Sequence, residues 1–168
     1  IRNILDYSKT NAITLQQELE STELYIKMEQ MRFSDKFDYY INVDPAINQN
    51  IKSIPPLILQ PYVENSIWHG LLHKDDGGTI YIDISQDGNF YDIRIDDNGI
   101  GRQKAQSIKT KSATKRKSHG MKITEDRIRL VHQLNGQGGT VRTVDKVDEQ
   151  GKPMGTTVII RLAISNTN

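Results

Sequence analysis

The stretch that decides the fold runs from Pro55 to Gly70 and reads PPLILQPYVENSIWHG. Its proline-rich start and the spacing of its apolar residues predict a helix over about 57–72. Pro61 either lies in the first turn of this helix or kinks it. The apolar side chains that it offers to a core are Leu57, Val63, Ile67 and Leu71.

Glu64, Asn65 and His69 fall on or near one face of this helix. Mg²⁺ prefers hard oxygen ligands, so Glu64 and Asn65 could bind a Mg²⁺ that also holds phosphates. The simpler alternative is a partly exposed polar helix face, on which His69 caps its helix instead of contacting a phosphate. The other three histidines have neither ligand spacing nor cysteine companions, which argues against a zinc site.

A second motif, DDNGIG, runs from Asp96 to Gly101 and directly follows a predicted strand. A buried carboxylate at Asp97 can accept a hydrogen bond from an exocyclic amine, and the glycines let the backbone come close to a flat ring. Adenine offers such an amine and such a ring. The alternative is an ordinary Asp-Asn-Gly turn. The helix and the glycine turn together favour an ATP pocket.

A basic stretch rich in serine and threonine follows the glycine turn. It suits a lid that closes over anionic phosphates. A solvated loop is the other interpretation, because most charge runs are solvated. The basic residues of this stretch are Lys109, Lys111, Lys115, Arg116 and Lys117.

The other predicted elements follow from periodicity and turn signals. A capping box at Thr14 begins a long amphipathic helix over 14–33, and residues 1–9 read as the end of an earlier helix. A further helix is expected from 124 to 134, after a helix entry that begins at 102. The predicted strands are 37–43, 79–85, 90–96, 140–147 and 155–164, with a hairpin turn at 86–89.

Composition excludes several classes of protein. The chain has 168 residues, 36% of them hydrophobic, which is enough for one main core. A net charge of +1 gives no bulk field for binding nucleic acid. The absence of cysteine excludes disulfides and thiolate metal sites and fits the cytosol.

Since the chain starts at Ile1 and contains no long apolar run, we expect a soluble piece of a longer protein. The lack of a Gly-x-Ser-x-Gly elbow argues against a serine hydrolase.

These motifs resemble the ATP-binding domain of sensor histidine kinases, within the group that includes gyrase B, Hsp90 and MutL. The resemblance covers nearly the whole chain. The stretch 59–70 is similar to the N box of the autolysis-sensor subfamily, 97–101 to its first glycine box, and Gly155-Thr156 to its closing Gly-Thr. It implies an α/β (α+β) two-layer sandwich: a mixed, mostly antiparallel sheet covered by helices on one face and preceded by a long helix.

The resemblance also implies roles for individual residues. Asn65 would bind Mg²⁺ with support from Glu64, and these two with His69 would be the catalytic residues. Asp97 would bind the adenine amine. The other cofactor-binding residues would be Gly99 and Gly101 near the base, Gly120 and Lys115 in the lid, and Thr156 near the adenine.

The chain departs from the family pattern at several positions. Trp68 stands where the N box usually has a lysine, and the second glycine box is reduced to 118–121, with Ile123 in place of an asparagine. Pro61 occupies the place of the water-activating glutamate of gyrase, Hsp90 and MutL, which argues against an ATP hydrolase of their type.

The resemblance predicts a protein-histidine kinase domain that transfers the γ-phosphate of ATP to a histidine upstream of this chain, for relay to a response regulator. Residues 1–36 would end a dimerising helical segment, and 37–168 would form the ATPase domain. The full-length protein is expected to be a homodimer, anchored by upstream helices in the cytoplasmic membrane with this domain in the cytoplasm. A nucleotide-binding regulatory module without kinase activity is the alternative. A purely helical interaction domain would require the pocket motifs to be coincidental.

Overall fold

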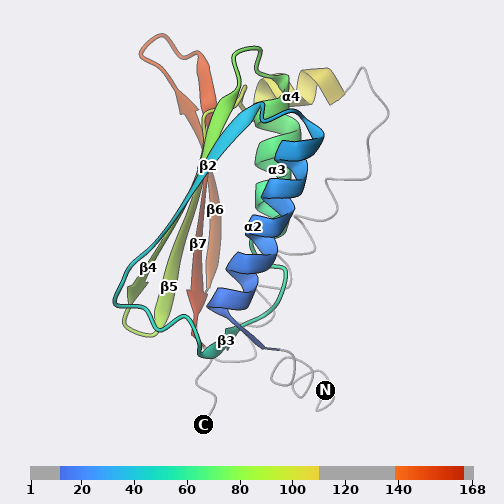
Figure 1. Cartoon of the computed structure of the whole chain (residues 1–168). Coiled ribbons are helices and arrows are strands. Elements are labelled where there is room, and N and C mark those ends of the chain that lie inside the picture. The colour runs from blue at the N-terminus through green and yellow to red at the C-terminus, as the bar shows by residue number, and fades with distance from the viewer. Residues whose placement is uncertain (1–11, 110–138, 165–168) are drawn as a thin grey trace, which may run out of the picture.

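The computed structural model describes residues 12–109 and 139–164, which form one five-stranded sheet with helices on one face (Figure 1). The strand order is β2-β4-β5-β7-β6. The first pair, β2 with β4, is parallel, and the other three pairs are antiparallel. The expected fold class, a mixed and mostly antiparallel sheet with helices on one face after a long helix, is confirmed.

The strands of this sheet are β2 Phe37–Val43, β4 Gly78–Asp87, β5 Phe90–Asp97, β6 Thr140–Val147 and β7 Pro153–Ala163. The helices are α2 Leu15–Arg32, α3 Gln60–Asn65 and α4 Arg102–Lys109. A π-helical turn, η1 Ser66–Gly70, and a 3₁₀ turn, η2 Leu71–His73, continue α3. The two short strands β1 Ile13–Thr14 and β3 Lys52–Ile54 pair with each other, and neither was predicted.

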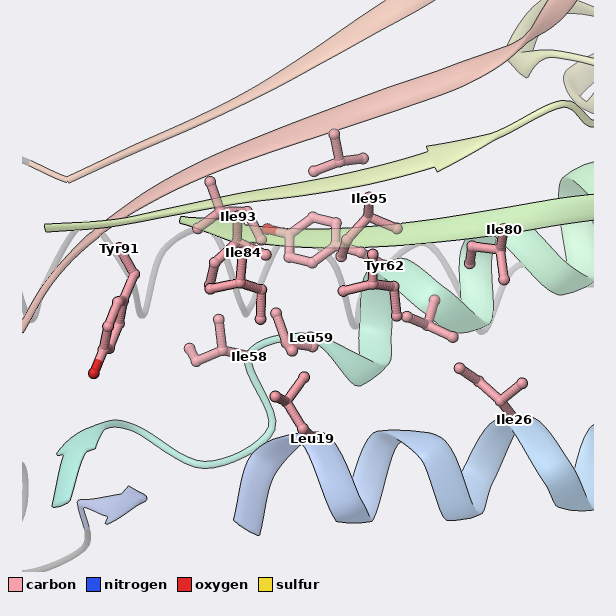
Figure 2. Close-up of a cluster of buried hydrophobic side chains, with 14 of the residues drawn as sticks. Leu19, Ile26, Ile58, Leu59, Tyr62, Ile80, Ile84, Tyr91, Ile93 and Ile95 are labelled. Carbon is pink, nitrogen blue, oxygen red and sulfur yellow. The ribbon is translucent and has the colours of Figure 1, made fainter. Parts of the chain in front are cut away.

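The core lies between the sheet and the helices. Isoleucines alternate along β4 and β5 toward this side, and Leu19 and Ile26 point to them from α2 (Figure 2). Ile58, Leu59 and Tyr62 fill the space between α2 and the sheet (Figure 2). Helix α2 therefore shares one buried cluster with the sheet.

The long helix α2 begins as its capping box predicts. The Thr14 hydroxyl accepts a hydrogen bond from the Gln17 backbone N–H, and the Gln17 side chain accepts one from the Thr14 N–H, both at 3.0 Å. This reciprocal pair satisfies two of the N–H groups that a helix start leaves without partners.

The helix predicted over 57–72 begins later than expected, at Gln60. Leu57 has a left-handed backbone with φ 59°, and its side chain is 52% exposed, so its assignment to the core is wrong. The proline-rich segment before Gln60 is an irregular turn. Pro61 lies in the first helical turn, where its missing N–H costs no hydrogen bond. Val63, Ile67 and Leu71 are buried as predicted.

Several expected features lie outside the described residues. These are the end of a helix at 1–9, the helix at 124–134, the basic stretch from Lys111 to Lys117 with Lys115, the reduced glycine box with Gly120, and Ile123.

Candidate functional site

Asp97 is the centre of the candidate site. It is the last residue of β5 and is 2% exposed. Its Oδ1 accepts hydrogen bonds from the backbone N–H groups of Gly99 at 2.9 Å and Thr156 at 3.3 Å. Its Oδ2 accepts one from the Thr156 hydroxyl at 2.5 Å. The carboxylate is therefore fixed by the neighbouring strand β7 and by the turn that follows it.

The hydrogen bonds of Asp97 leave room for one more donor. Two carboxylate oxygens offer about four acceptor positions, and three are occupied within the described residues. The remaining position is on Oδ2, beside the Thr156 hydroxyl, which also has lone pairs to offer. An exocyclic amine with two N–H groups matches this pair of acceptors.

Two glycines bring the end of the N-box helix, which consists of α3 and η1, against the glycine turn at 97–101. A Cβ on Gly99 would lie 2.4 Å from the Gly70 Cα, and a Cβ on Gly70 would lie 3.1 Å from Asp97 Oδ1. The Ile100 N–H also donates to the Gly70 carbonyl at 3.3 Å. Since only glycine permits this approach, η1 ends directly beside the Asp97 carboxylate. This role of Gly70 was not predicted, although Gly70 is the last residue of the N-box motif.

Gly101 and Gly155 complete the backbone around Asp97. Gly101 has φ 80° and leads into α4, where its carbonyl accepts from the Ala105 N–H at 3.1 Å. Gly155 has φ 109°, and a Cβ there would lie 2.0 Å from the Asp97 carbonyl oxygen. The role of Gly155 was not predicted. The feature of the sequence that could have indicated this role is the position of Gly155 directly before Thr156.

The structure separates the predicted polar residues of the N box. Asn65 is half-buried and forms no side-chain hydrogen bond within the described part of the chain. Glu64 accepts a hydrogen bond from the Gln60 side chain at 3.2 Å and interacts electrostatically with Tyr25 of α2. Glu64 therefore lies on the α2 side of its helix. His69 is half-buried in the π-helical turn, a feature that is frequent at functional sites.

Trp68 also faces α2. Its ring packs edge-to-face against Phe33 at 5.2 Å between centroids, and the Arg32 guanidinium lies 5.1 Å from its centre. Its Nε1–H donates to the Tyr25 hydroxyl at 3.2 Å. Burial raises the pKa of Tyr25 above its usual range, and the charges of Glu64 and Glu29 add to this effect, so the hydroxyl stays protonated. Position 68 thus joins the N-box helix to α2.

The contacts of Trp68 predict its contribution to stability. Trp68→Ala is expected to lower the free energy of unfolding by about 2 kcal/mol, less than for a fully buried tryptophan because the side chain is partly exposed. Trp68→Phe should keep an aromatic ring at this position and lose the hydrogen bond to Tyr25, about 1 kcal/mol. Urea unfolding measures both values, and equal losses in the two variants would contradict a packing role for the ring.

Asp96 lies on the opposite face of β5 from Asp97. It accepts from Lys146 Nζ at 2.8 Å and from the Thr157 hydroxyl. Burial alone raises the pKa of Asp96, but these hydrogen bonds and the Lys146 charge outweigh it, so the pKa lies below its ordinary 3.8. The two neighbouring carboxylates are thus bound on different faces, and only Asp97 belongs to the glycine site.

The lowered pKa of Asp96 predicts a pH dependence of stability. The unfolded chain binds this proton more tightly than the folded chain does. The stabilisation is therefore present above pH 3.8 and lost as the pH falls through the lower folded-state value. Lys146→Met should reduce the loss of melting temperature on going from about pH 5 to pH 3. A variant that melts with the wild-type pH profile would contradict the assignment of this shift to Lys146.

Curated proteins with similar sequences include sensor proteins. The chain is 34% identical over 100 residues to the sensor protein LytS of Staphylococcus epidermidis, a match that covers 60% of the chain and 17% of that protein. It is 32% identical over 131 residues to the putative uncharacterized protein YwpD of Bacillus subtilis, covering 77% of the chain and 46% of YwpD. The chain thus spans less than half the length of these relatives. None of the known family profiles matches it.

Solved structures with a similar fold are histidine kinase domains. The catalytic domain of histidine kinase ThkA superposes with a TM-score of 0.60 at 15% identity, covering 90% of this chain and 94% of that one. This is the histidine kinase catalytic-domain fold. The mycobacterial sensor histidine kinase MprB gives a TM-score of 0.57 at 16% identity, with 89% and 95% covered. The LytS relatives and the histidine kinase fold together support the predicted resemblance to sensor histidine kinases of the autolysis-sensor subfamily.

The described residues contain neither a metal-binding cluster nor a membrane-spanning helix. Residues 12–109 and 139–164 contain no group of three or more histidine and acidic side chains that could hold a metal ion by themselves. No helix within these ranges is both long and apolar enough to cross a membrane.

Proposed function

We propose that this chain is the ATP-binding catalytic domain of a two-component sensor histidine kinase. The observation that carries the proposal is the buried Asp97 carboxylate, fixed by Thr156 and Gly99 with one acceptor position left for an amine. The relationship to the LytS sensors and the histidine kinase fold support it. Adenine would bind at Asp97, and the phosphates would extend along the N-box helix toward Asn65.

In this proposal the domain positions ATP for transfer of its γ-phosphoryl group. The acceptor is an imidazole nitrogen of a histidine upstream of this chain, and the products are ADP and a phosphohistidine. The phosphoryl group then passes to an aspartate of a response regulator. Because phosphoryl transfer needs little covalent help from the protein, positioning and charge neutralisation supply most of the catalysis. Pro61 cannot act as a base, so the site would not activate water at that position.

The metal proposal rests on Asn65. Its amide oxygen would hold Mg²⁺, which neutralises phosphate charge when it is bound. Glu64 would support the metal shell only if its side chain turned away from Tyr25 and Gln60, because its contacts lie on the α2 side. His69 would contact the phosphates, as would Lys115 of the basic lid, which Gly120 would anchor.

The rest of the protein is also part of the proposal. Residues 1–36 would end a dimerising segment of a homodimer, and 37–168 would form the ATPase domain. Since α2 shares the core of the sheet, it would be the element that joins the two. The full-length protein would be anchored in the cytoplasmic membrane through upstream segments, with this domain in the cytoplasm. No nucleic acid is expected to bind.

The test is a calorimetric titration of this chain with a non-hydrolysable ATP analogue, with and without Mg²⁺. We expect saturable binding that Mg²⁺ strengthens. Autophosphorylation is then assayed in a longer protein that includes the upstream histidine. Phosphate on that histidine would support the kinase. ATP binding without transfer would favour the alternative, a regulatory module without kinase activity, which is suggested by Trp68 in the place of a lysine. No binding at all would contradict both.

A further inference from the structure

A buried carboxylate of α2, Glu18, holds the turn that leads into the N-box helix. Glu18 is 2% exposed. Its Oε2 accepts from the Leu57 N–H at 2.9 Å, and its Oε1 accepts from the N–H groups of Ile58 at 2.8 Å and Leu59 at 2.9 Å. Three consecutive backbone donors thus bind one carboxylate, and hydrogen bonds to an ionised acceptor are stronger than neutral ones.

The turn needs this support because its backbone is strained. Leu57 has φ 59°, a conformation that costs a residue with a side chain about 1–2 kcal/mol. Its side chain is 52% exposed, so burial does not compensate for that cost. Such a conformation persists only where surrounding contacts impose it, and the contact made by the Leu57 backbone N–H is the one to Glu18.

The turn also lies where the chain enters the domain. Strand β1 pairs with β3 through Ile13 and Ile54, and β3 leads directly into the Pro55-Pro56 segment. Glu18 stands one turn into α2, which starts immediately after β1. The residues that lead into α2 and those that lead into the N-box helix are therefore held together by the β1–β3 pair and by Glu18.

The other end of the same helical segment is fastened to α2 as well, through Trp68 and Tyr25. Asn65 lies between these two points, and Gly70 lies two residues beyond Trp68, at the end of η1 and against Asp97. Helix α3 and η1 form one continuous helical segment from Gln60 to Gly70. A shift at its start would be transmitted to both residues.

We propose that Glu18 is a positioning residue for the nucleotide site. It fixes the start of the helix that carries Asn65 and Gly70 relative to α2 and to the entry of the chain. This inference rests on the proposed function, because it names the residue that sets the geometry of that ATP site from outside it. Nucleotide binding at Asp97 and the order of the Leu57–Leu59 turn are then coupled, and coupling between two sites acts in both directions.

The first measurement uses the unmodified 168-residue chain. Amide hydrogen exchange is followed with and without a non-hydrolysable ATP analogue. We expect slower exchange not only at Gly99 and Thr156, beside the adenine, but also at Leu57, Ile58 and Leu59. Protection at Gly99 and Thr156 with unchanged exchange at the turn would overturn the inference.

The second measurement compares Glu18→Gln with Glu20→Gln. Glu20 is an exposed residue of α2 that accepts a hydrogen bond only from Gln16 among the described residues, so its variant controls for the charge change on the same helix. Glutamine at 18 places an NH₂ group against a backbone donor. We expect Glu18→Gln to bind the analogue about tenfold more weakly, which equals about 1.4 kcal/mol, and Glu20→Gln to bind as the wild type does.

Calorimetric titrations are made at a temperature at which melting curves show both variants folded. A purely structural role would lower the melting temperature of Glu18→Gln and leave its affinity unchanged, which would overturn the inference alone. Absence of binding by the unmodified chain would instead overturn the proposed function and, with it, the inference. Glu18→Asp, which keeps the charge but shortens the reach, should also bind more weakly than the wild type.

Discussion

Gly155→Ala is expected to lower the free energy of unfolding by about 2 to 5 kcal/mol, the sum of left-handed backbone strain and an overpacked contact. The added Cβ would lie 2.0 Å from the Asp97 carbonyl oxygen and 2.9 Å from the Asn98 Cα. Both are backbone atoms, so no side chain can move aside. Strands β5 and β7 would have to separate at Asp97 and Thr156, the pair that fixes the candidate adenine site.

Gly151→Ala is the matched control for this change. Gly151 has φ 77°, but a Cβ there would meet nothing within 4 Å. It should therefore show only the cost of the left-handed backbone, about 1 kcal/mol. Urea unfolding of both variants separates the two contributions. Similar losses in the two would show that the contact with Asp97 relaxes at little cost, and that Gly155 is required only for its φ.

Periodicity predicted the regular elements well. The apolar spacing of 14–33 and its capping box gave α2 nearly to the residue, and the alternation around the turn at Gly88 gave β4 and β5. In these segments the local pattern and the buried face agree. Strands β1 and β3, with two and three residues, are too short to show any period, so they were missed.

The start of the N-box helix could not be predicted from local sequence. The segment from Leu57 contains good helix formers, yet its first three N–H groups bind Glu18, about forty residues earlier in the chain. A carboxylate that distant in sequence leaves no signal in a window around Leu57. The contact also explains why Glu18, which reads as a surface residue of an amphipathic helix, is buried.

Only part of the candidate site could be predicted. The resemblance pointed to Asp97 and Thr156, and the structure places them in direct contact, while their binding of adenine stays a prediction. The contact of Gly70 with Gly99 depends on how the helix packs against the sheet, which neither motif encodes alone. Glu64 and Asn65 are adjacent in the motif, but Glu64 lies toward α2, because successive helical residues point about 100° apart.

Asp97→Asn is expected to weaken ATP binding by about 1 to 3 kcal/mol, or roughly five- to a hundredfold. Asp97 accepts three hydrogen bonds, from the Gly99 N–H, the Thr156 N–H and the Thr156 hydroxyl. An asparagine has one acceptor oxygen. Its NH₂ group must therefore face either the backbone N–H groups of Gly99 and Thr156 or the adenine amine, and each orientation sets a donor against a donor.

Asp96→Asn is a closely matched control, because it is the same substitution on the adjacent residue of the same strand. Asp96 faces the other side of the sheet and binds Lys146 and Thr157, so its variant should lose stability but keep its affinity for ATP. Calorimetric titration with a non-hydrolysable analogue gives the two affinities. If Asp97→Asn binds as tightly as Asp96→Asn, Asp97 does not contact the adenine amine. Its buried hydrogen bonds would then serve only to join β5 to β7.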